Sequence, residues 1–259
     1  MIELEADDVF VTIDPDHGGR IEQIEVGTRG GPVGLLQSDP ALGPMTWGSF
    51  PMAPWAGRVR DGRFRFDGEE ERIRVNMPPH SIHGTTFDME WEVVDAGRDY
   101  AELRCPLTWQ FGGVAHQHFA LTPDGITCIL TVYAQQRAMP AFIGWHPNFA
   151  KPASAELEFE AMYVRDDDYI AVPELVPPKD HPWDDCFVRP LRPLRLHYPG
   201  VTVTLESDCD HWVVFDMMGE LTAVEPQSGP PDAFTIGGAT RLEPGDLLQR
   251  TMHIAWSGR

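Results

Sequence analysis

Long hydrophobic runs are missing from this sequence of 259 residues, and so is any sign of export. No uninterrupted apolar stretch reaches the roughly 20 residues that a membrane-spanning helix needs. The acidic, alternating start MIELEADDVF has neither the basic beginning nor the apolar block of a secretory signal peptide. We therefore expect a cytoplasmic protein that does not cross a membrane.

Basic residues are scarce as well: 20 Lys and Arg stand against 40 Asp and Glu, for a formal net charge of −20. Binding to nucleic acid or to anionic lipid depends on clustered cations, and the sequence has no basic cluster. We expect no nucleic-acid partner and no membrane partner. A neutral small molecule suits this charge better than an anionic one, although a local arginine pocket can still hold an anion.

Cysteine is rare, and its spacing excludes the common metal and redox motifs. The four cysteines are Cys105, Cys128, Cys186 and Cys209. They form no CxxC pair and share no zinc-type spacing with histidine. We expect reduced and mostly buried thiols, and a disulfide between two of them stays open.

Other motifs of well-known enzyme classes are absent too. The sequence lacks the GxSxG elbow of serine hydrolases, the GxxxxGK[ST] phosphate loop and the GxGxxG dinucleotide loop. His116 and His118 share one face of a predicted strand, as metal-binding histidines do in cupins. No Glu follows them in FALTPDG to complete such a site, so we predict no metal ligands.

Glycine and proline, by contrast, are abundant at 24 residues each and are spread evenly along the chain. Between them, polar and apolar residues alternate as in β-strands. The alternating stretches are Val9–Ile13, Arg63–Phe66, Glu90–Val94, Ile126–Tyr133, Glu156–Phe159 and Val201–Leu205. His118–Tyr133 predicts a hairpin, and no stretch keeps a helical period for three turns. We predict one all-β domain over residues 1–259, a large antiparallel β-sandwich.

Five segments interrupt the alternation, and in β-folds such segments often carry functional residues. They are Gly48–Gly62 (GSFPMAPWAGRVRDG), Pro78–Gly84 (PPHSIHG), Ile143–Phe149 (IGWHPNF), Pro182–Phe187 (PWDDCF) and Ala223–Ala233 (AVEPQSGPPDA). Each also has an ordinary interpretation when taken alone: a proline-rich connection, a solvated loop histidine, a capped strand end or an acidic turn.

Two of these segments carry candidates for acid–base chemistry. Pro147 favours an extended conformation at His146, and Trp145 and Phe149 are apolar neighbours that can hold its imidazole rigid. Glu225 follows a short apolar strand and precedes a proline, so we place it at a strand end that faces a cavity. A carboxylate and an imidazole, with ordinary pKa values of about 4.3 and 6.5, suit a base and an acid near neutral pH.

In this order and spacing, the segments resemble the aldose 1-epimerase (galactose mutarotase) family. The matching pieces are residues 18–26 (GGRIEQIEV), 50–68, 80–93, 144–149 (GWHPNF), 183–187 (WDDCF) and 223–234 (AVEPQSGPPDAF). They cover the chain nearly end to end. The resemblance implies a large β-sandwich, in agreement with the alternating pattern, and an isomerase that interconverts the α and β anomers of an aldose.

The resemblance also implies roles for individual residues. His146 matches the general acid of the family, Glu225 matches the general base, and His83 matches a second active-site histidine. Arg58 matches a substrate-binding arginine, and Asp184 matches an aspartate that binds a sugar hydroxyl.

The reaction itself needs one base at the C1 hydroxyl and one acid at the ring oxygen. Neither a metal nor an organic cofactor is therefore expected. Trp145, with Trp55 and Trp183, is expected to pack against the apolar faces of the sugar ring. The surplus of acidic residues is expected to favour the protonated form of His146 and so to raise its pKa.

Two alternatives stay open for the function. Arg58, together with Arg60 or Arg63, can supply the cations that a phosphorylated or otherwise anionic sugar requires. A non-catalytic carbohydrate-binding module is the second alternative. Gly57 stands where the family has asparagine, and the chain is shorter than typical galactose mutarotases, so the sugar is not identified. The protein is expected to be a monomer or a homodimer.

Overall fold

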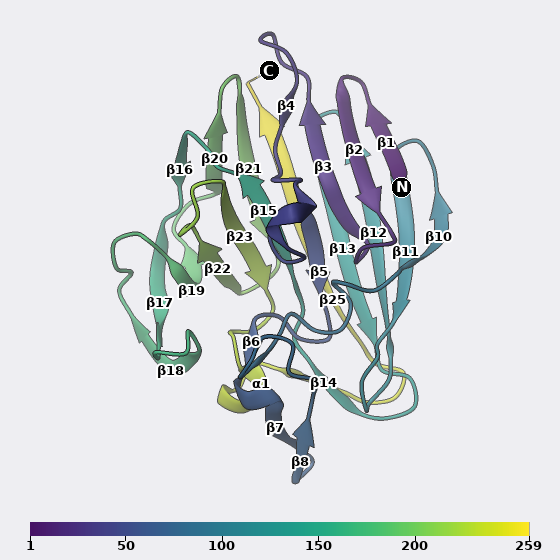
Figure 1. Ribbon diagram of the computed structural model, residues 1–259, viewed down its shortest axis with the longest axis vertical. Helices are drawn as coiled ribbons and strands as arrows, with labels where there is room; N and C mark the ends of the chain where they lie inside the picture. The colour runs from purple at the N-terminus through teal and green to yellow at the C-terminus, as the bar shows by residue number, and fades with distance from the viewer. Residues whose placement is uncertain (259) are drawn as a thin grey trace.

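Two large sheets face each other in the computed structural model, which describes residues 1–258 (Figure 1). Neighbouring strands run antiparallel in both sheets. The predicted all-β class is confirmed, because the helical segments have only three or four residues each. Within residues 1–258, no helix is long and apolar enough to cross a membrane.

The larger sheet has 11 strands. Along its main path the strands are β1 (Ile2–Ala6), β2 (Val9–Asp14), β3 (Arg20–Val26), β5 (Ser49–Met52), β15 (Gly144–Ala150), β23 (Leu221–Gln227), β22 (His211–Phe215), β19 (Asp184–Pro190), β17 (Phe159–Arg165) and β18 (Ala171–Val176). A further strand, β4 (Val33–Gly34), pairs with β3 beside this path. The middle of the sheet, where β5, β15 and β23 adjoin, therefore joins distant parts of the chain.

The second sheet has eight strands. They are β10 (Glu92–Ala96), β11 (Tyr100–Pro106), β12 (Val114–Thr122), β13 (Gly125–Tyr133), β25 (Leu247–Ser257), β21 (Val201–Ser207), β20 (Leu194–Tyr198) and β16 (Ser154–Glu156).

Three two-stranded ribbons and three short helical segments complete the described structure. The ribbons are β6 (Arg58–Val59) with β9 (Ser81–Ile82), β7 (Arg63–Phe66) with β8 (Glu69–Arg72), and β14 (Met139–Ala141) with β24 (Thr240–Leu242). The helical segments are η1 (Pro40–Leu42), η2 (Arg60–Gly62) and α1 (Ala233–Ile236). In Figure 1, the ribbons and α1 gather at one end of the sandwich, below β5 and β23.

Most of the predicted strands are present. Val9–Ile13 lies in β2, and Val201–Leu205 begins β21. The predicted hairpin His118–Tyr133 is formed by β12 and β13, whose last registered pair is Thr122 and Gly125. These strands alternate between buried and less buried residues along much of their length, which is why their sequence pattern was informative.

Two predicted strands need correction. Glu156–Phe159 is not one strand, because β16 ends at Glu156 in the smaller sheet and β17 begins at Phe159 in the larger one. The alternation continues across this crossing, so the sequence pattern hides the change of sheet. Glu90–Val94 was predicted as a strand, whereas the strand found there, β10, spans Glu92–Ala96.

Three segments that interrupt the alternation are partly or mostly strand in the structure. Ile143–Phe149 lies mostly in β15, Pro182–Phe187 overlaps β19, and Ala223–Ala233 begins within β23. Glu225 therefore lies inside a strand and not at a strand end, because β23 continues through Pro226.

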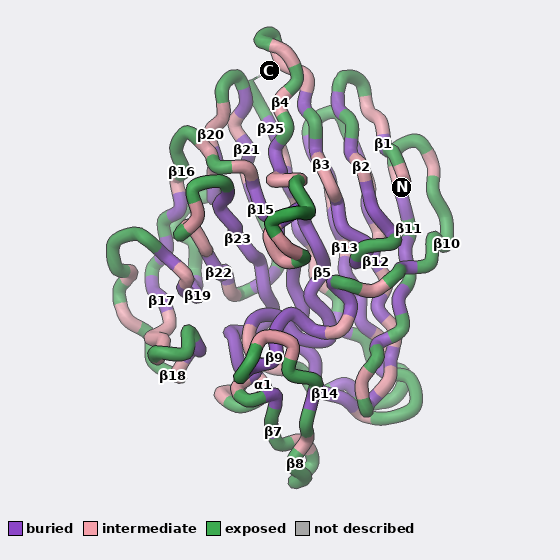
Figure 2. The backbone as a smooth tube through the Cα atoms, viewed as in Figure 1, coloured by how far each residue is buried: buried purple, intermediate pink, exposed green. Residues whose placement is uncertain are grey.

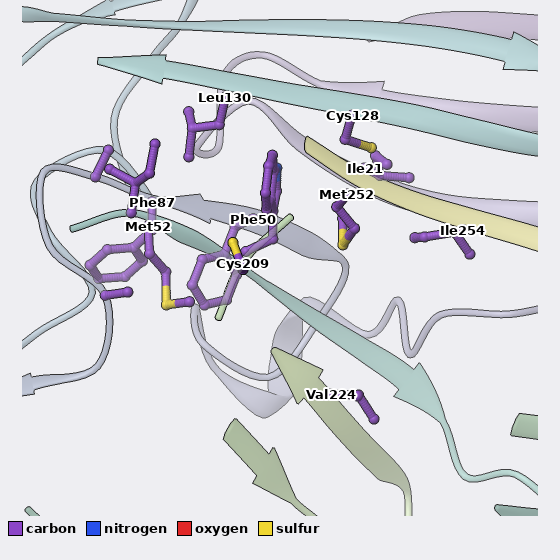
Figure 3. Packing of buried hydrophobic residues seen from close by; sticks show 14 of the residues in the cluster. Ile21, Phe50, Met52, Phe87, Cys128, Leu130, Cys209, Val224, Met252 and Ile254 are labelled. Carbon is purple, nitrogen blue, oxygen red and sulfur yellow. The ribbon is translucent and has the colours of Figure 1, made fainter. Parts of the chain in front are cut away.

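The core lies between the two sheets, and the buried stretches in Figure 2 run along the central strands of both. Figure 3 shows Ile21, Phe50 and Val224 of the larger sheet in the same cluster as Cys128 and Met252 of the smaller one. All four cysteines are free and buried, as expected from the sequence. A core shared by both sheets holds β15 and β23 in place at the centre of the larger sheet.

The pairing of β15 with β23 is interrupted by two prolines. Registered partners are Gly144 with Gln227 and, after a gap, Asn148 with Ala223. Within the gap lie Pro147 on β15 and Pro226 on β23, and neither can donate a ladder hydrogen bond because proline has no N–H. The register is the same on both sides of the gap, so the two strands stay aligned through it.

Glycine at position 144 permits the close approach of these strands. A Cβ atom there would lie 2.3 Å from the backbone oxygen of Pro226 and 3.0 Å from the Cα of Gln227. Backbone atoms cannot rotate away from such a contact, so any side chain at this position must push the strands apart.

Gly144→Ala is therefore expected to lower the free energy of unfolding by about 1–3 kcal/mol, the usual cost of overpacking. Urea unfolding measures this change. Gly219→Ala is the matched control, because nothing lies within 4 Å of the Cβ position at Gly219, and it should change stability by less than about 0.5 kcal/mol. Equal effects of the two substitutions would contradict the steric explanation.

Candidate active site

A cavity of about 870 Å³, part of it open to solvent, lies against the larger sheet. Side chains from β15, β17, β19, β22 and β23 line it, together with residues of the β6 and β9 ribbon. Five predicted site residues are among them: Arg58, His83, His146, Asp184 and Glu225. The fold thus brings together five residues that lie in five separate segments of the sequence.

His146 and Glu225 are in direct contact in the wall of this cavity. The Nε2 atom of His146 lies 3.3 Å from Oε1 of Glu225, and their side chains are only 10% and 3% exposed. His146 lies on β15 and Glu225 on β23, within the stretch that contains the two prolines. The shared register places them opposite each other, so the two side chains project from the same face of the sheet.

Aromatic contacts fix the orientation of the His146 imidazole. The ring of Phe50, on the neighbouring strand β5, stacks on it with a centroid distance of 4.7 Å and an interplanar angle of 16°. His83 meets it edge-on, at 5.0 Å and 83°. The Nδ1 atoms of both histidines are buried and have no hydrogen-bond partner among the described residues. Packing, and not a second hydrogen bond, therefore holds this imidazole.

A buried cation lies near these rings. The guanidinium of Arg20 lies 4.0 Å from the ring centroid of Trp47 and 5.2 Å from that of Phe50. It donates hydrogen bonds to four backbone carbonyl groups, and no carboxylate of residues 1–258 lies within ion-pair distance of it. Burial lowers the pKa of Arg20 to about 10, so this group remains charged at neutral pH.

Burial dominates the proton affinities of the three central groups. Burial, together with a smaller effect of the positive charge of Arg20, lowers the pKa of His146 to about 3. The pKa of His83 is also well below its ordinary value, because of burial and, to a smaller extent, the neighbouring His146 and Arg58. Burial raises the pKa of Glu225 well above its ordinary value, and the nearby charge of Asp184 adds to this effect.

The expectation that the acidic surplus raises the pKa of His146 is therefore wrong. The surplus charges lie mainly at the surface, where water and salt screen them. His146 instead loses the hydration that stabilises an imidazolium ion. In the free protein at neutral pH, the structure favours an uncharged imidazole beside Glu225.

Arg58 and Asp184 form a second pair at the cavity wall. The Nη2 atom of Arg58 lies 3.6 Å from Oδ2 of Asp184. Burial raises the pKa of Asp184, while the charge of Arg58 opposes this effect. Gly57 precedes the arginine with a φ of +65° and lies against Pro231, so the backbone at this position favours glycine.

Trp145, the sixth predicted site residue, does not line the cavity. Successive side chains of a strand point to opposite faces, so the residue next to His146 points away from it, and Trp145 is only 1% exposed. Trp55 and Trp183 lie outside this cavity too. The aromatic residues that do line it are Tyr163, Tyr169 and Phe215.

Several cavity residues were not anticipated from the sequence. Arg165 lines the cavity, pairs with Asp185 at 2.7 Å and lies 4.0 Å from the ring centroid of Tyr169. These contacts depend on tertiary packing and leave no local signal. Gln227 also lines the cavity. Its position two residues after Glu225 is a signal, because residues i and i+2 of a strand share a face.

Within residues 1–258, no three His, Cys, Asp or Glu side chains are grouped as a metal site. His116 packs against Tyr133 with ring centroids 5.2 Å apart, and His118 lies 3.3 Å from Glu102. These two histidines therefore make ordinary contacts along the surface of a strand.

Comparison with known proteins identifies one family. The family model described as aldose 1-epimerase matches residues 1–255. Among curated proteins, YphB of Escherichia coli K12 is 34% identical over 119 residues, which cover 43% of this chain and 39% of YphB. The matched segment is thus less than half the length of that relative.

Solved structures share the fold over nearly the whole chain. A galactose mutarotase-like protein from Clostridium acetobutylicum has a TM-score of 0.87 and 16% identity, covering 99% of this chain and 95% of that one. The GalM/aldose epimerase homologue from C. elegans has a TM-score of 0.85 and 13% identity, covering 99% and 98%. These likenesses confirm the expected large antiparallel β-sandwich.

Burial of His146 generates a direct spectroscopic prediction. Its imidazole is expected to stay neutral down to about pH 4 in the free protein, because its pKa is about 3. The unfolded chain takes up this proton near pH 6.5. The contribution of His146 to stability is therefore present above pH 6.5 and decreases as the pH falls toward 3.

NMR titration of the ring nitrogens of His146 measures this protonation. A His146 midpoint at or above pH 6.5 would show that the environment of this imidazole is not the one described.

Proposed function

The chain belongs to the aldose 1-epimerase family, and from this premise we propose that it is an aldose 1-epimerase, or mutarotase. It interconverts the α and β anomers of an aldose by opening and closing the sugar ring. The observation that carries the proposal is the buried contact between His146 and Glu225 in a cavity wall. A proton donor and a proton acceptor within reach of one small molecule are what this reaction requires.

Ring opening moves two protons in opposite directions. In the proposed reaction, Glu225 takes the proton of the C1 hydroxyl while His146 gives a proton to the ring oxygen. The bond between C1 and the ring oxygen breaks, and C1 becomes an aldehyde. Rotation about the C1–C2 bond presents the other face of the aldehyde, and the reverse transfers then close the ring as the other anomer.

The two side chains work as a unit that carries one exchangeable proton. In the free protein this proton belongs on Glu225, because burial disfavours both the carboxylate and the imidazolium. The distance of 3.3 Å allows direct transfer from Glu225 to His146. A bound sugar favours this transfer, because its C1 hydroxyl donates a hydrogen bond to the carboxylate and its ring oxygen accepts one from the imidazolium.

The remaining predicted residues hold the sugar. Arg58 and Asp184 line the same cavity and carry donor and acceptor groups for ring hydroxyls. His83 lies edge-on to His146, and burial keeps its pKa well below the ordinary value, so it serves as a neutral partner. We assign these three residues to substrate binding and to the orientation of His146.

The charges of the cavity support a neutral aldose over a phosphorylated sugar. Arg58 is paired with Asp184, and Arg165 is paired with Asp185. Arg60 and Arg63, the further cations proposed for an anionic substrate, do not line this cavity, and Arg60 is held by two aspartates. No cation of the described cavity wall lacks a carboxylate partner, so a phosphate group would have to break an existing ion pair.

The same site supports an enzyme over a carbohydrate-binding module. A binding module needs hydrogen bonds and aromatic surfaces for the sugar, and it gains nothing from an imidazole in contact with a carboxylate. Burying this pair costs solvation free energy. The proposed proton transfer explains why this pair is buried despite that cost.

Glu225→Gln is expected to lower kcat by about 10²–10⁴-fold, because an amide keeps the shape of the side chain but cannot take the proton. Polarimetry of freshly dissolved α-glucose or α-galactose measures the rate after subtraction of the spontaneous reaction. Glu206→Gln is the control, because Glu206 is exposed on the smaller sheet, and it should leave the rate unchanged. More than about a tenth of the wild-type rate in Glu225→Gln would rule out this residue as the base.

A further inference from the structure

Gln227 is buried beside the proposed base and is only half satisfied by hydrogen bonds. It is 0% exposed and lines the cavity. Its Nε2 atom donates a hydrogen bond of 3.0 Å to Oε2 of Glu225. Its Oε1 atom has no hydrogen-bond partner among the described residues. An unpaired acceptor in a buried position is costly, so its presence in a cavity points to a ligand that supplies the donor.

The strand geometry leaves this oxygen free. Gln227 stands opposite Gly144 on β15, and glycine offers no side chain to bond it. Glu225 and Gln227 are two residues apart on β23, so both project from the face that carries the cavity. The amide therefore lies next to Glu225, on the far side of that residue from Ala223.

We infer that Gln227 both positions the carboxylate of Glu225 and binds the C2 hydroxyl of the sugar through its free amide oxygen. The inference rests on the proposed function, in which Glu225 acts on the C1 hydroxyl. The carbon next to C1 in the ring, away from the ring oxygen, is C2. The C2 hydroxyl therefore lies next to Gln227, the residue beside Glu225, while the ring oxygen lies next to His146.

This contact makes the configuration at C2 a determinant of specificity. Glucose and galactose share their C2 configuration and satisfy the amide oxygen equally. Mannose directs its C2 hydroxyl elsewhere, and 2-deoxyglucose lacks the hydroxyl altogether. A site built to bond a hydroxyl discriminates against an analogue without it, because the buried acceptor is then left unpaired.

The test compares glucose with 2-deoxyglucose in the wild type and in Gln227→Met, which keeps the length of the side chain without its polar atoms. Anomer exchange is followed by NMR, and the spontaneous rate of each sugar is subtracted. We expect the wild type to favour glucose by about tenfold in kcat/KM, the value of one hydrogen bond. In Gln227→Met both rates should fall, because Glu225 loses its donor, and the preference should fall to about one.

Gln227→Glu is a second variant, and it tests the inference even if Gln227→Met does not fold. It keeps the shape and an acceptor oxygen but removes the amide donor to Glu225. Both rates should fall, while the preference for glucose should remain. A loss of packing alone would lower the rates with glucose and with 2-deoxyglucose by the same factor. It would therefore leave the preference for glucose the same in Gln227→Met and in Gln227→Glu.

The outcomes distinguish this inference from the proposed function. A wild type that exchanges both sugars at equal rates, or a Gln227→Met variant that keeps the wild-type preference, overturns the inference and leaves the proposed function standing. A wild type that accelerates neither sugar overturns both.

Discussion

The stretch of β15 and β23 that contains Pro147 and Pro226 is the constraint on which the rest of the site depends. Neither proline can donate to the ladder, yet the register of the two strands is the same on both sides of them. In this stretch, His146 and Glu225 face each other at 3.3 Å. The stacked ring of Phe50 supports one partner of this contact, and the amide of Gln227 supports the other.

Burial, and not the net charge of the protein, sets the protonation of this pair. The formal charge of −20 would favour an imidazolium if it acted at full strength. Water and salt screen this net charge before it reaches His146. The loss of hydration acts directly on His146 and lowers its pKa, and the buried charge of Arg20 lowers it as well. In the proposed mechanism, the pair therefore holds its proton on Glu225 in the free protein, and a bound sugar supplies the hydrogen bonds that stabilise the charged form.

Local sequence patterns predicted the sheet class, since alternation reports which face of a strand is buried. The five predicted residues that line the cavity came from the segments that interrupt the alternation and from the family resemblance, and the other lining residues were not predicted. Pro147 indicated the extended conformation of His146. The position of Trp145 was misjudged, because closeness to His146 in sequence means the opposite face in a strand. Gln227 was overlooked, because Pro226 suggested the end of a strand. The contacts of Phe50 and Arg20 arise from the pairing of β3, β5 and β15, which no local pattern encodes.

In the proposed complex, the edge of the sugar formed by C1 and the ring oxygen lies against the His146 and Glu225 pair, and the other roles in the site depend on this contact. A crystal structure of Glu225→Gln soaked with glucose tests it most directly, because this variant should bind the sugar without turning it over. The account predicts that the C1 hydroxyl and the ring oxygen lie within about 2.6–3.2 Å of the substituted side chain and of Nε2 of His146. A sugar whose C1 edge faces solvent, with C4 or C6 against the pair, would contradict it.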